Sequence, residues 1–160
     1  MFRVRSTEKR LQGLTFVDLF SGIGGFHLAL ESYGAKCVFA SEINEAAAKV
    51  YYDNFKLKPY GDIRDVKAKR IPKHDILCAG FPCQAFSISG NQNGFSDENG
   101  KLFFEILRIA RYHNPKLILL ENVKNLLTHD NGKSMEVIEN RLQKIGYKIF
   151  KEVICATNFS

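Results

Sequence analysis

Short apolar runs alternate with helix-like segments along this 160-residue chain, and the alternation restricts the folds that it can adopt. Strands are expected at residues 15–20, 36–40, 75–79, 116–120 and 147–154. Helices are expected between them, at residues 26–33, 45–54, 102–112 and 134–145. Strands and helices that alternate at this spacing build βαβ units with right-handed crossovers and a mostly parallel sheet. We therefore expect one α/β domain over residues 1–160, because the sequence has no visible linker or internal repeat.

Residues suited to helix ends support these boundaries. Asn44 precedes an alanine-rich segment and can accept a hydrogen bond from the first turn of a helix. Ser134 is expected to cap the last helix in the same way. Gly34 and Gly146 follow the final turns of two predicted helices, where a glycine commonly ends a helix.

The composition is that of a soluble globular protein, with 45% hydrophobic and 25% charged residues. No run approaches the roughly 18 apolar residues of a membrane span, so no membrane association is expected. The four cysteines are spaced too irregularly for a zinc site or a disulfide framework, which favours a reducing, cytoplasmic compartment and no metal.

The chain carries 23 Lys and Arg against 17 Asp and Glu, a net charge of +6, which is compatible with a polyanionic partner. The positive charges are scattered. The densest stretch, Lys67–Arg70, is expected to be a solvated face.

Three segments at the ends of successive strands indicate a nucleotide-like ligand. Asp18–Gly25 forms a glycine-rich turn after the first strand, where the backbone can approach a ligand closely. It lacks both the G-x-G-x-x-G pattern and a Walker lysine, which disfavours a phosphate cradle. Glu42 follows the second strand, as acids that bind ribose hydroxyls do, and Asp62-Ile63 offers a second acid and an apolar neighbour. An adenosine-containing ligand without a required pyrophosphate fits this set.

Cys83 directly follows Pro82 and comes just after the apolar run that ends at Gly80. Chemistry in open α/β sheets gathers at the carboxyl ends of strands. A thiol at this place can be a nucleophile where its surroundings favour the thiolate. The same residue can equally be a small buried hydrophobe, as most unpaired cysteines are.

Taken together, the chain resembles the cytosine-C5 DNA methyltransferases, the S-adenosylmethionine-dependent enzymes of restriction–modification systems. The matching motifs come in the family's order: Asp18–Gly25, Glu42, Asp62-Ile63, Gly80–Gln84 and Glu121–Val123. Residues 80–130 look close to the bacterial enzyme that methylates the inner cytosine of GCGC. The resemblance implies the Rossmann-like methyltransferase fold, truncated here before its last antiparallel strand.

The resemblance also implies roles for individual residues. Cys83 and Glu121 would be catalytic. S-adenosyl-L-methionine would be bound by Phe20, Ser21, Gly22, Ile23, Gly24, Gly25, Glu42, Ile43, Asp62, Ile63, Gly80, Pro82 and Leu102. Phe20 and Ile43 would pack on its adenine, and Glu42 would take its ribose. The substrate would be contacted by Phe81, Gln84, Ser87, Ser89, Asn122 and Val123.

The implied reaction acts on a cytosine flipped out of double-stranded DNA. The Cys83 thiolate adds to C6, Glu121 stabilises the charge that develops at N3, and the methyl group passes to C5. Transient addition of this kind divides one hard step into easier ones. Residues 84–100 would be a loop that closes over the DNA, and an ordinary polar surface loop is the other interpretation.

The family's later motifs, including its target-recognition domain, are absent from this sequence. One hypothesis is therefore an enzyme that needs a complementing segment, and another is a non-catalytic S-adenosylmethionine-binding or interaction module. A methyltransferase of different specificity is a third. The strand at 116–121 is expected to have an unpaired edge, which favours self-association or pairing with a second polypeptide.

Overall fold

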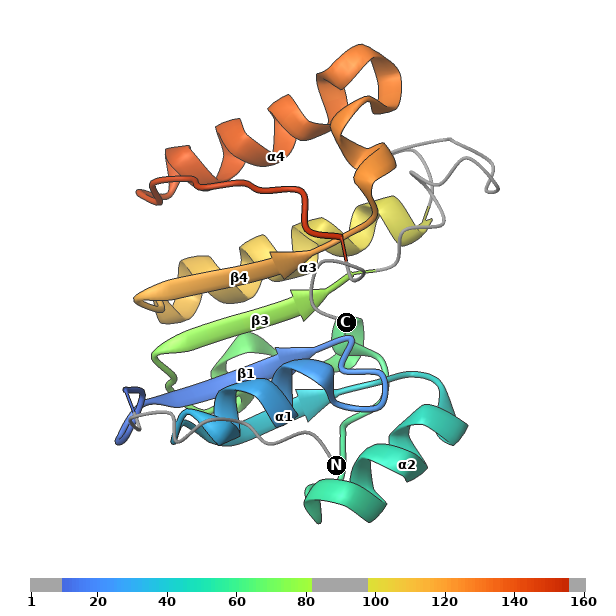
Figure 1. Cartoon of the computed structure of the whole chain (residues 1–160), viewed down its shortest axis with the longest axis vertical. Helices are drawn as coiled ribbons and strands as arrows, with labels where there is room; N and C mark the ends of the chain where they lie inside the picture. The colour runs from blue at the N-terminus through green and yellow to red at the C-terminus, as the bar shows by residue number, and fades with distance from the viewer. Residues whose placement is uncertain (1–9, 82–97, 156–160) are drawn as a thin grey trace. The chain divides into compact units, whose positions relative to one another are not determined.

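The computed structural model describes residues 10–81 and 98–155 (Figure 1). By its internal contacts the chain divides into two compact units. The first comprises Met1–Phe81 and Phe104–Glu121, and the second comprises Pro82–Phe103 and Asn122–Ser160. Whether residues 1–160 fold as one domain stays a prediction.

The first unit is built on a four-stranded sheet in the order β2-β1-β3-β4. Its strands are β1 (Thr15–Leu19), β2 (Lys36–Ser41), β3 (Ile76–Gly80) and β4 (Leu117–Glu121). All three pairings are parallel, which confirms the predicted α/β class. The register matches Leu19 to both Ser41 and Ala79, so the carboxyl ends of these strands lie at one level.

Helices join and cover these strands. They are α1 (Gly25–Ser32), α2 (Glu45–Phe55), the 3-10 turns η1 (Ile63–Asp65) and η2 (Ala68–Arg70), and α3 (Glu98–His113). The predicted cap of α2 is confirmed, because the Asn44 side chain accepts a hydrogen bond from the backbone N–H of Ala47 at 3.0 Å. α3 begins four residues before the predicted start at residue 102.

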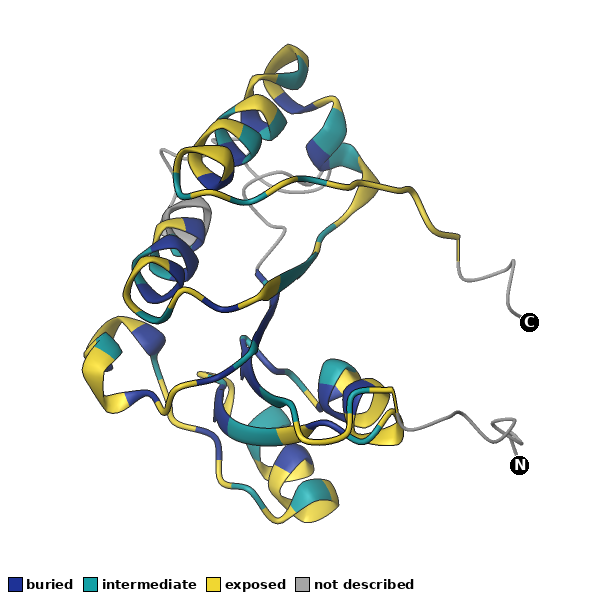
Figure 2. Ribbon diagram, turned by 90° about the vertical axis from the view of Figure 1, so that its left-hand side faces the viewer, coloured by how far each residue is buried: buried dark blue, intermediate teal, exposed yellow. Residues whose placement is uncertain are grey.

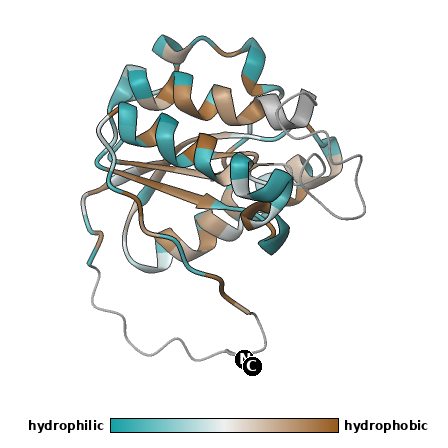
Figure 3. Cartoon of the chain, turned by 90° about the horizontal axis from the view of Figure 1, so that it is seen from above, coloured by the Kyte–Doolittle hydropathy of each residue, from teal (hydrophilic) through white to brown (hydrophobic). Residues whose placement is uncertain are grey.

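The core follows the two-residue period of the strands. Phe16, Ile76 and Cys78 face α1 and form a buried cluster with Leu30 and Ala35. The intervening residues Val17, Leu77 and Ala79 are fully buried as well and must face the other side, which α3 covers. Figure 3 shows the strands in brown between helices whose outer faces are teal.

Asp75 joins the amino ends of three strands. Its carboxylate accepts hydrogen bonds from the backbone N–H of Thr15 at 3.0 Å and from the Lys116 ammonium at 2.8 Å. Its own backbone N–H donates to the carbonyl of Thr15. These contacts lower the pKa of the Asp75 carboxyl to about 2, chiefly through Lys116.

The second unit contains η4 (Lys124–Leu127), η5 (His129–Gly132) and α4 (Lys133–Lys144). The predicted cap at Ser134 is wrong, since the N-cap of α4 is Gly132. Ser134 is instead buried in the first turn of α4, where its hydroxyl pairs with Nδ1 of His129 at 2.7 Å. The helix was predicted correctly, but the hydroxyl of its serine contacts a side chain, and local sequence does not reveal that contact.

The predicted strand at 147–154 is also wrong, because residues 147–155 have no strand pairing in the described part of the chain. Phe150 is 83% exposed and Ile154 is 67% exposed. A β-strand is stabilised by a hydrogen-bonded neighbour. Without one, an apolar run alone does not produce a strand.

Within residues 10–81 and 98–155, none of the helices is both long and apolar enough to cross a membrane.

Candidate functional site

The turn between β1 and α1 has a backbone shape that few residues adopt. Phe20 has φ 55° and Gly24 has φ 98°, both in the left-handed region. The backbone N–H of Ser21 donates to the carbonyl of Ser41 on β2 at 2.9 Å, and that of Gly24 donates to Ser21 at 2.9 Å. The turn is therefore fixed to the end of the neighbouring strand.

Glu42 joins the turn after β1 to the turn after β2. One carboxylate oxygen accepts the backbone N–H of Gly22 at 2.7 Å, and the other accepts that of Asn44 at 2.8 Å. The Glu42 backbone N–H donates to Tyr60, whose own N–H donates to Ala40. The acid predicted to bind ribose thus also organises the loops around it, and each carboxylate oxygen keeps a lone pair for a further donor.

Apolar side chains stand exposed beside Glu42. Ile23 is 63% exposed and Ile43 is 67% exposed, while Phe20 is half-buried. The structure therefore brings three of the predicted cofactor-binding residues to the ends of β1 and β2. Two large exposed aliphatic side chains next to a carboxylate suit a ligand with an apolar face and hydroxyl groups.

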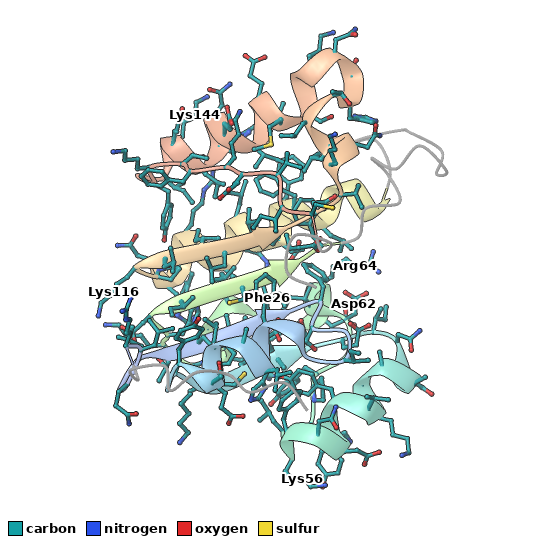
Figure 4. All side chains as sticks on the ribbon, in the orientation of Figure 1. Phe26, Lys56, Asp62, Arg64, Lys116 and Lys144 are labelled. Atoms are coloured by element: carbon teal, nitrogen blue, oxygen red, sulfur yellow. The ribbon has the colours of Figure 1, made fainter. Side chains whose placement is uncertain are left out.

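Asp62 and Ile63, the third predicted pair, lie at the start of η1. Arg64 contacts both carboxylate oxygens of Asp62, with Nε at 2.9 Å from Oδ2 (Figure 4). This contact is the main reason why the pKa of Asp62 lies below its ordinary value. The Ile63 side chain is only 2% exposed, and its carbonyl accepts a hydrogen bond from Arg108 at 3.1 Å. Ile63 therefore belongs to the core, and its predicted contact with a ligand stays a prediction.

Asp18 is a candidate that the predicted site residues do not include. It is 1% exposed, and neither carboxylate oxygen has a hydrogen-bond partner among the described residues. Burial raises the pKa of this carboxyl to about 7; the nearby dipole of the His27 backbone N–H, which forms no hydrogen bond with it, opposes the rise, and the charge of Glu42 adds to it. The sequence did contain a signal for a buried acid at this place, because Asp18 lies in a strand whose neighbouring residues are apolar.

The ends of β3 and β4 bring Glu121, the predicted catalytic glutamate, beside Gly80. Gly80 precedes the segment that carries Cys83, here called the cysteine loop. Gly80 pairs with Glu121 in the sheet register. A Cβ atom built on Gly80 would lie 3.5 Å from Oε2 of Glu121, so the carboxylate lies over Gly80. Cys83 comes three positions after Gly80 in the sequence. Phe81 is 3% exposed, which places this predicted substrate contact in the core of its unit.

Several predicted site residues lie outside the described residues: Pro82, Cys83, Gln84, Ser87 and Ser89. Most of the predicted loop, residues 84–100, lies there too. Leu102, Asn122 and Val123 belong to the second unit. Leu102 is half-buried, and Asn122 accepts the backbone N–H of Val123 at 2.9 Å.

The other cysteines differ in exposure. Cys78 is fully buried, and Cys37 is half-buried with its pKa raised by burial to about 11. Cys155 is exposed. In the described ranges no group of three or more His, Cys, Asp or Glu side chains could hold a metal ion.

The basic stretch Lys67–Arg70 lies on and next to η2, with its three charged side chains exposed as predicted. It leads into the amino end of β3, whereas the candidate site lies at the carboxyl ends of the strands.

Comparison with known proteins identifies a single family. The family described as C-5 cytosine-specific DNA methylase matches residues 14–160. The chain is 54% identical over 152 residues to the type II methyltransferase M.HhaI of Haemophilus parahaemolyticus, covering 95% of this chain and 46% of that protein. It is 48% identical to M.HpaII of Haemophilus parainfluenzae over 163 residues, covering 99% and 46%. The chain thus spans about half the length of these relatives.

Solved structures agree with this similarity. The Entamoeba histolytica methyltransferase EhMeth superposes with a TM-score of 0.70 at 25% identity, covering 91% of this chain and 48% of that one. The S. pombe Dnmt2 methyltransferase gives a TM-score of 0.61 at 30% identity, covering 79% and 41%.

Proposed function

Because the chain belongs to the C-5 cytosine-specific DNA methylase family, we propose that it carries the cofactor and nucleophile part of an enzyme that methylates C5 of cytosine in double-stranded DNA. The observation that carries the proposal is the convergence at the strand ends. A glycine-rich turn, a carboxylate that ties two loops and two exposed isoleucines meet at β1 and β2. Glu121 lies over the residue that leads into the cysteine loop.

The residues at β1 and β2 fit S-adenosyl-L-methionine, which supplies a methyl group activated by its sulfonium. The free lone pairs of Glu42 suit ribose hydroxyls, and the exposed Ile23 and Ile43, with Phe20, suit an adenine ring. Ser21 adds a buried hydroxyl that has no partner among the described residues. The backbone of Gly22–Gly25, Asp62-Ile63, Gly80, Pro82 and Leu102 would complete the site.

The reaction assigns complementary roles to Cys83 and Glu121. The Cys83 sulfur would form a bond to C6, which moves the electrons of the C5–C6 double bond to C5. Glu121 would hold the cytosine at N3 and stabilise the charge that develops there. After methylation, loss of the C5 proton would return the electrons and break the bond between sulfur and C6. Phe81, Gln84, Ser87, Ser89, Asn122 and Val123 would position the base and the DNA backbone.

Double-stranded DNA is the proposed partner, and the net charge of +6 suits it. The cytoplasm is the proposed location, because a nucleophilic thiol must stay reduced and have access to DNA.

We also propose a second polypeptide segment or a second copy of the chain as a partner at the free edge of β4. In the described sheet, β4 pairs only with β3, and Leu117 is 44% exposed. Light scattering at high concentration should show association that Leu117→Lys weakens. Val50→Lys, at a residue of α2 that is 42% exposed, is the matched control. A strict monomer would contradict association through this edge.

Calorimetry with S-adenosylmethionine tests the cofactor site. We expect binding that Glu42→Ala removes and Glu42→Gln weakens, since the amide keeps only one acceptor oxygen. No heat of binding at millimolar ligand would overturn the assignment.

A gel assay with 5-fluorocytosine DNA tests the chemistry, because fluorine at C5 cannot leave as a proton does and the Cys83 adduct persists. Cys83→Ser and Glu121→Gln are the controls. Cofactor binding without an adduct would support the alternative, a non-catalytic S-adenosylmethionine-binding module.

A further inference from the structure

Behind the glycine-rich turn lies a group of rings, here called the aromatic buttress, formed by the buried Tyr51 of α2 and His27 of α1 and by the half-buried Phe55 of α2. We propose that Phe55 is a positioning residue for cofactor binding. Its ring fills the space behind Gly24 and keeps the turn at 21–25 in the shape that presents Glu42 to the ligand. The inference rests on the proposed function and adds a residue that does not itself line the ligand site.

The Phe55 ring lies directly against Gly24. A Cβ atom built on Gly24 would lie 2.1 Å from Cε2 and 2.8 Å from Cζ of Phe55. Gly24 also has φ 98° and forms the N-cap of α1. Position 24 therefore requires glycine for two reasons, its backbone conformation and the ring behind it. Moving the ring would remove the surface against which the turn is packed.

The position of Phe55 is itself fixed by buried neighbours. Its ring stacks on His27, with ring centroids 3.9 Å apart and an interplanar angle of 11°. Nδ1 of His27 pairs with the Tyr51 hydroxyl at 2.6 Å, and Tyr51 is fully buried. The same hydroxyl lies 3.6 Å from the Cys37 sulfur on β2. The buttress thus connects α1, α2 and β2 at a point directly behind the turn.

The turn connects the Phe55 ring with Glu42, the residue proposed to contact the ligand. Gly22, two residues before Gly24, donates its backbone N–H to Glu42 at 2.7 Å. A displacement of the turn would therefore lengthen or break the bond that orients the Glu42 carboxylate. The apparent dissociation constant rises in inverse proportion to the fraction of molecules whose site is in the binding conformation. Loss of the buttress should accordingly weaken affinity without removing any group that touches the ligand.

Phe55→Leu tests the proposal, because leucine stays apolar and removes the Cε2 and Cζ atoms. We expect the dissociation constant for S-adenosylmethionine to rise about tenfold if only a tenth of the molecules keep the binding shape. Tyr52→Leu is the matched control, since Tyr52 lies on the same helix and is 46% exposed. Its affinity should stay within about twofold of wild type. Calorimetry is done well below the unfolding temperature, with folding checked by near-UV circular dichroism.

A double-mutant cycle separates positioning from general loss of stability. Gly24→Ala should weaken binding strongly in wild type and less in the Phe55→Leu background, where the two closest atoms are gone. The backbone strain of alanine at φ 98° is present in both backgrounds and cancels. Additive losses of affinity would overturn the proposal.

A further variant covers the case in which Phe55→Leu does not fold. Tyr51→Phe keeps the ring and removes the hydroxyl that holds His27, and affinity should fall about threefold as the competent fraction drops. Wild-type affinity in Tyr51→Phe would then overturn the proposal. Wild-type protein that binds no S-adenosylmethionine would overturn the proposed function itself. Binding by wild type with unchanged affinity in Phe55→Leu would overturn the positioning role alone.

Discussion

β3 and β4 are adjacent strands of similar apolar sequence, yet they differ sharply in burial. β3 pairs with β1 and β4, and its first four residues are at most 2% exposed. β4 pairs only with β3 among the described strands, and its residues are half-buried or exposed. Figure 2 shows this change from dark blue to teal and yellow. Position in the sheet, more than composition, therefore sets how much an apolar strand contributes to stability.

The same contrast continues along the chain after β4. Residues 147–155 are rich in apolar and β-branched side chains, as strands often are, yet they have no described strand partner and are largely exposed. Few buried contacts and solvent-exposed backbone groups lower local stability. The centre of the sheet and the C-terminal segment should therefore respond very differently to the same perturbation.

Hydrogen exchange should give the largest difference. Amides of β3 should open only on global unfolding, with a free energy on the order of 5 kcal/mol or more, whereas residues 147–155 should open at nearly no cost. Exchange followed by mass spectrometry measures both segments in one sample. Equal protection would show that the segment is held as firmly as the central strand.

Cysteine alkylation should give the next largest difference. Cys78 in β3 is fully buried, and burial raises the pKa of its thiol, so it should react only when the protein unfolds. Cys155 is exposed and Cys37 is half-buried. We expect Cys83 and Cys155 to react first, Cys37 slowly and Cys78 last, by about a thousandfold or more given a typical folding equilibrium. Iodoacetamide labelling with mass spectrometry measures the order, and early labelling of Cys78 would contradict it.

The pH dependence of stability should distinguish Asp18, inside β1, from Asp75, at the strand starts. Asp18 has a folded pKa of about 7, above its ordinary 3.8, so its contribution is full below pH 3.8 and is lost as pH rises towards 7. Asp18→Asn should therefore gain stability relative to wild type across this range. The pKa difference corresponds to about 4 kcal/mol at most.

Asp75 is the control of opposite sign. Its folded pKa is about 2, below the ordinary 3.8, so its stabilisation is present above pH 3.8 and is lost as pH falls towards 2. Asp75→Asn should be less stable than wild type above pH 3.8, and the difference should disappear as pH falls towards 2. Urea unfolding at several pH values measures both variants, and parallel curves for Asp18→Asn and wild type would show that burial does not perturb Asp18.

Truncating matched leucines should give the smallest difference. Leu77→Ala in β3 removes a fully buried side chain and should lower the free energy of unfolding by about 3 kcal/mol. Leu117→Ala in β4 removes one that is 44% exposed and should cost about 1 kcal/mol or less. Chemical denaturation measures both. Equal costs would mean that the β4 edge is covered in solution.

Much of the fold and of the candidate site was predictable from the sequence. The four strands of the sheet follow from their apolar runs, and the cap at Asn44 follows from its side-chain chemistry. The glycine-rich turn and Glu42 were predicted together, and the structure places them in direct contact. Local patterns of this kind can be predicted because strand period, helix capping and turn chemistry act over a few residues.

The failures depend on distant partners. Ser134 is of a residue type that is common at helix N-caps, but its hydroxyl pairs with His129. Residues 147–154 have the pattern of a strand, but strand formation needs a neighbour that local sequence cannot supply. The burial of the Ile63 side chain in the core was likewise not foreseen, while its predicted contact with a ligand stays a prediction.

By itself, the sequence determined the family, the order of strands and helices, and the motifs that carry the proposed chemistry. The charge state of Asp18, the edge position of β4 in the described sheet and the requirement for glycine at position 24 emerged only from the folded chain. Each of these depends on what lies next to a residue in space: a low-dielectric core around a carboxylate, the position of β4 at the end of the described sheet, and the ring of Phe55 behind the turn. Burial and contact between distant segments arise only when the chain has folded, so no local pattern encodes them.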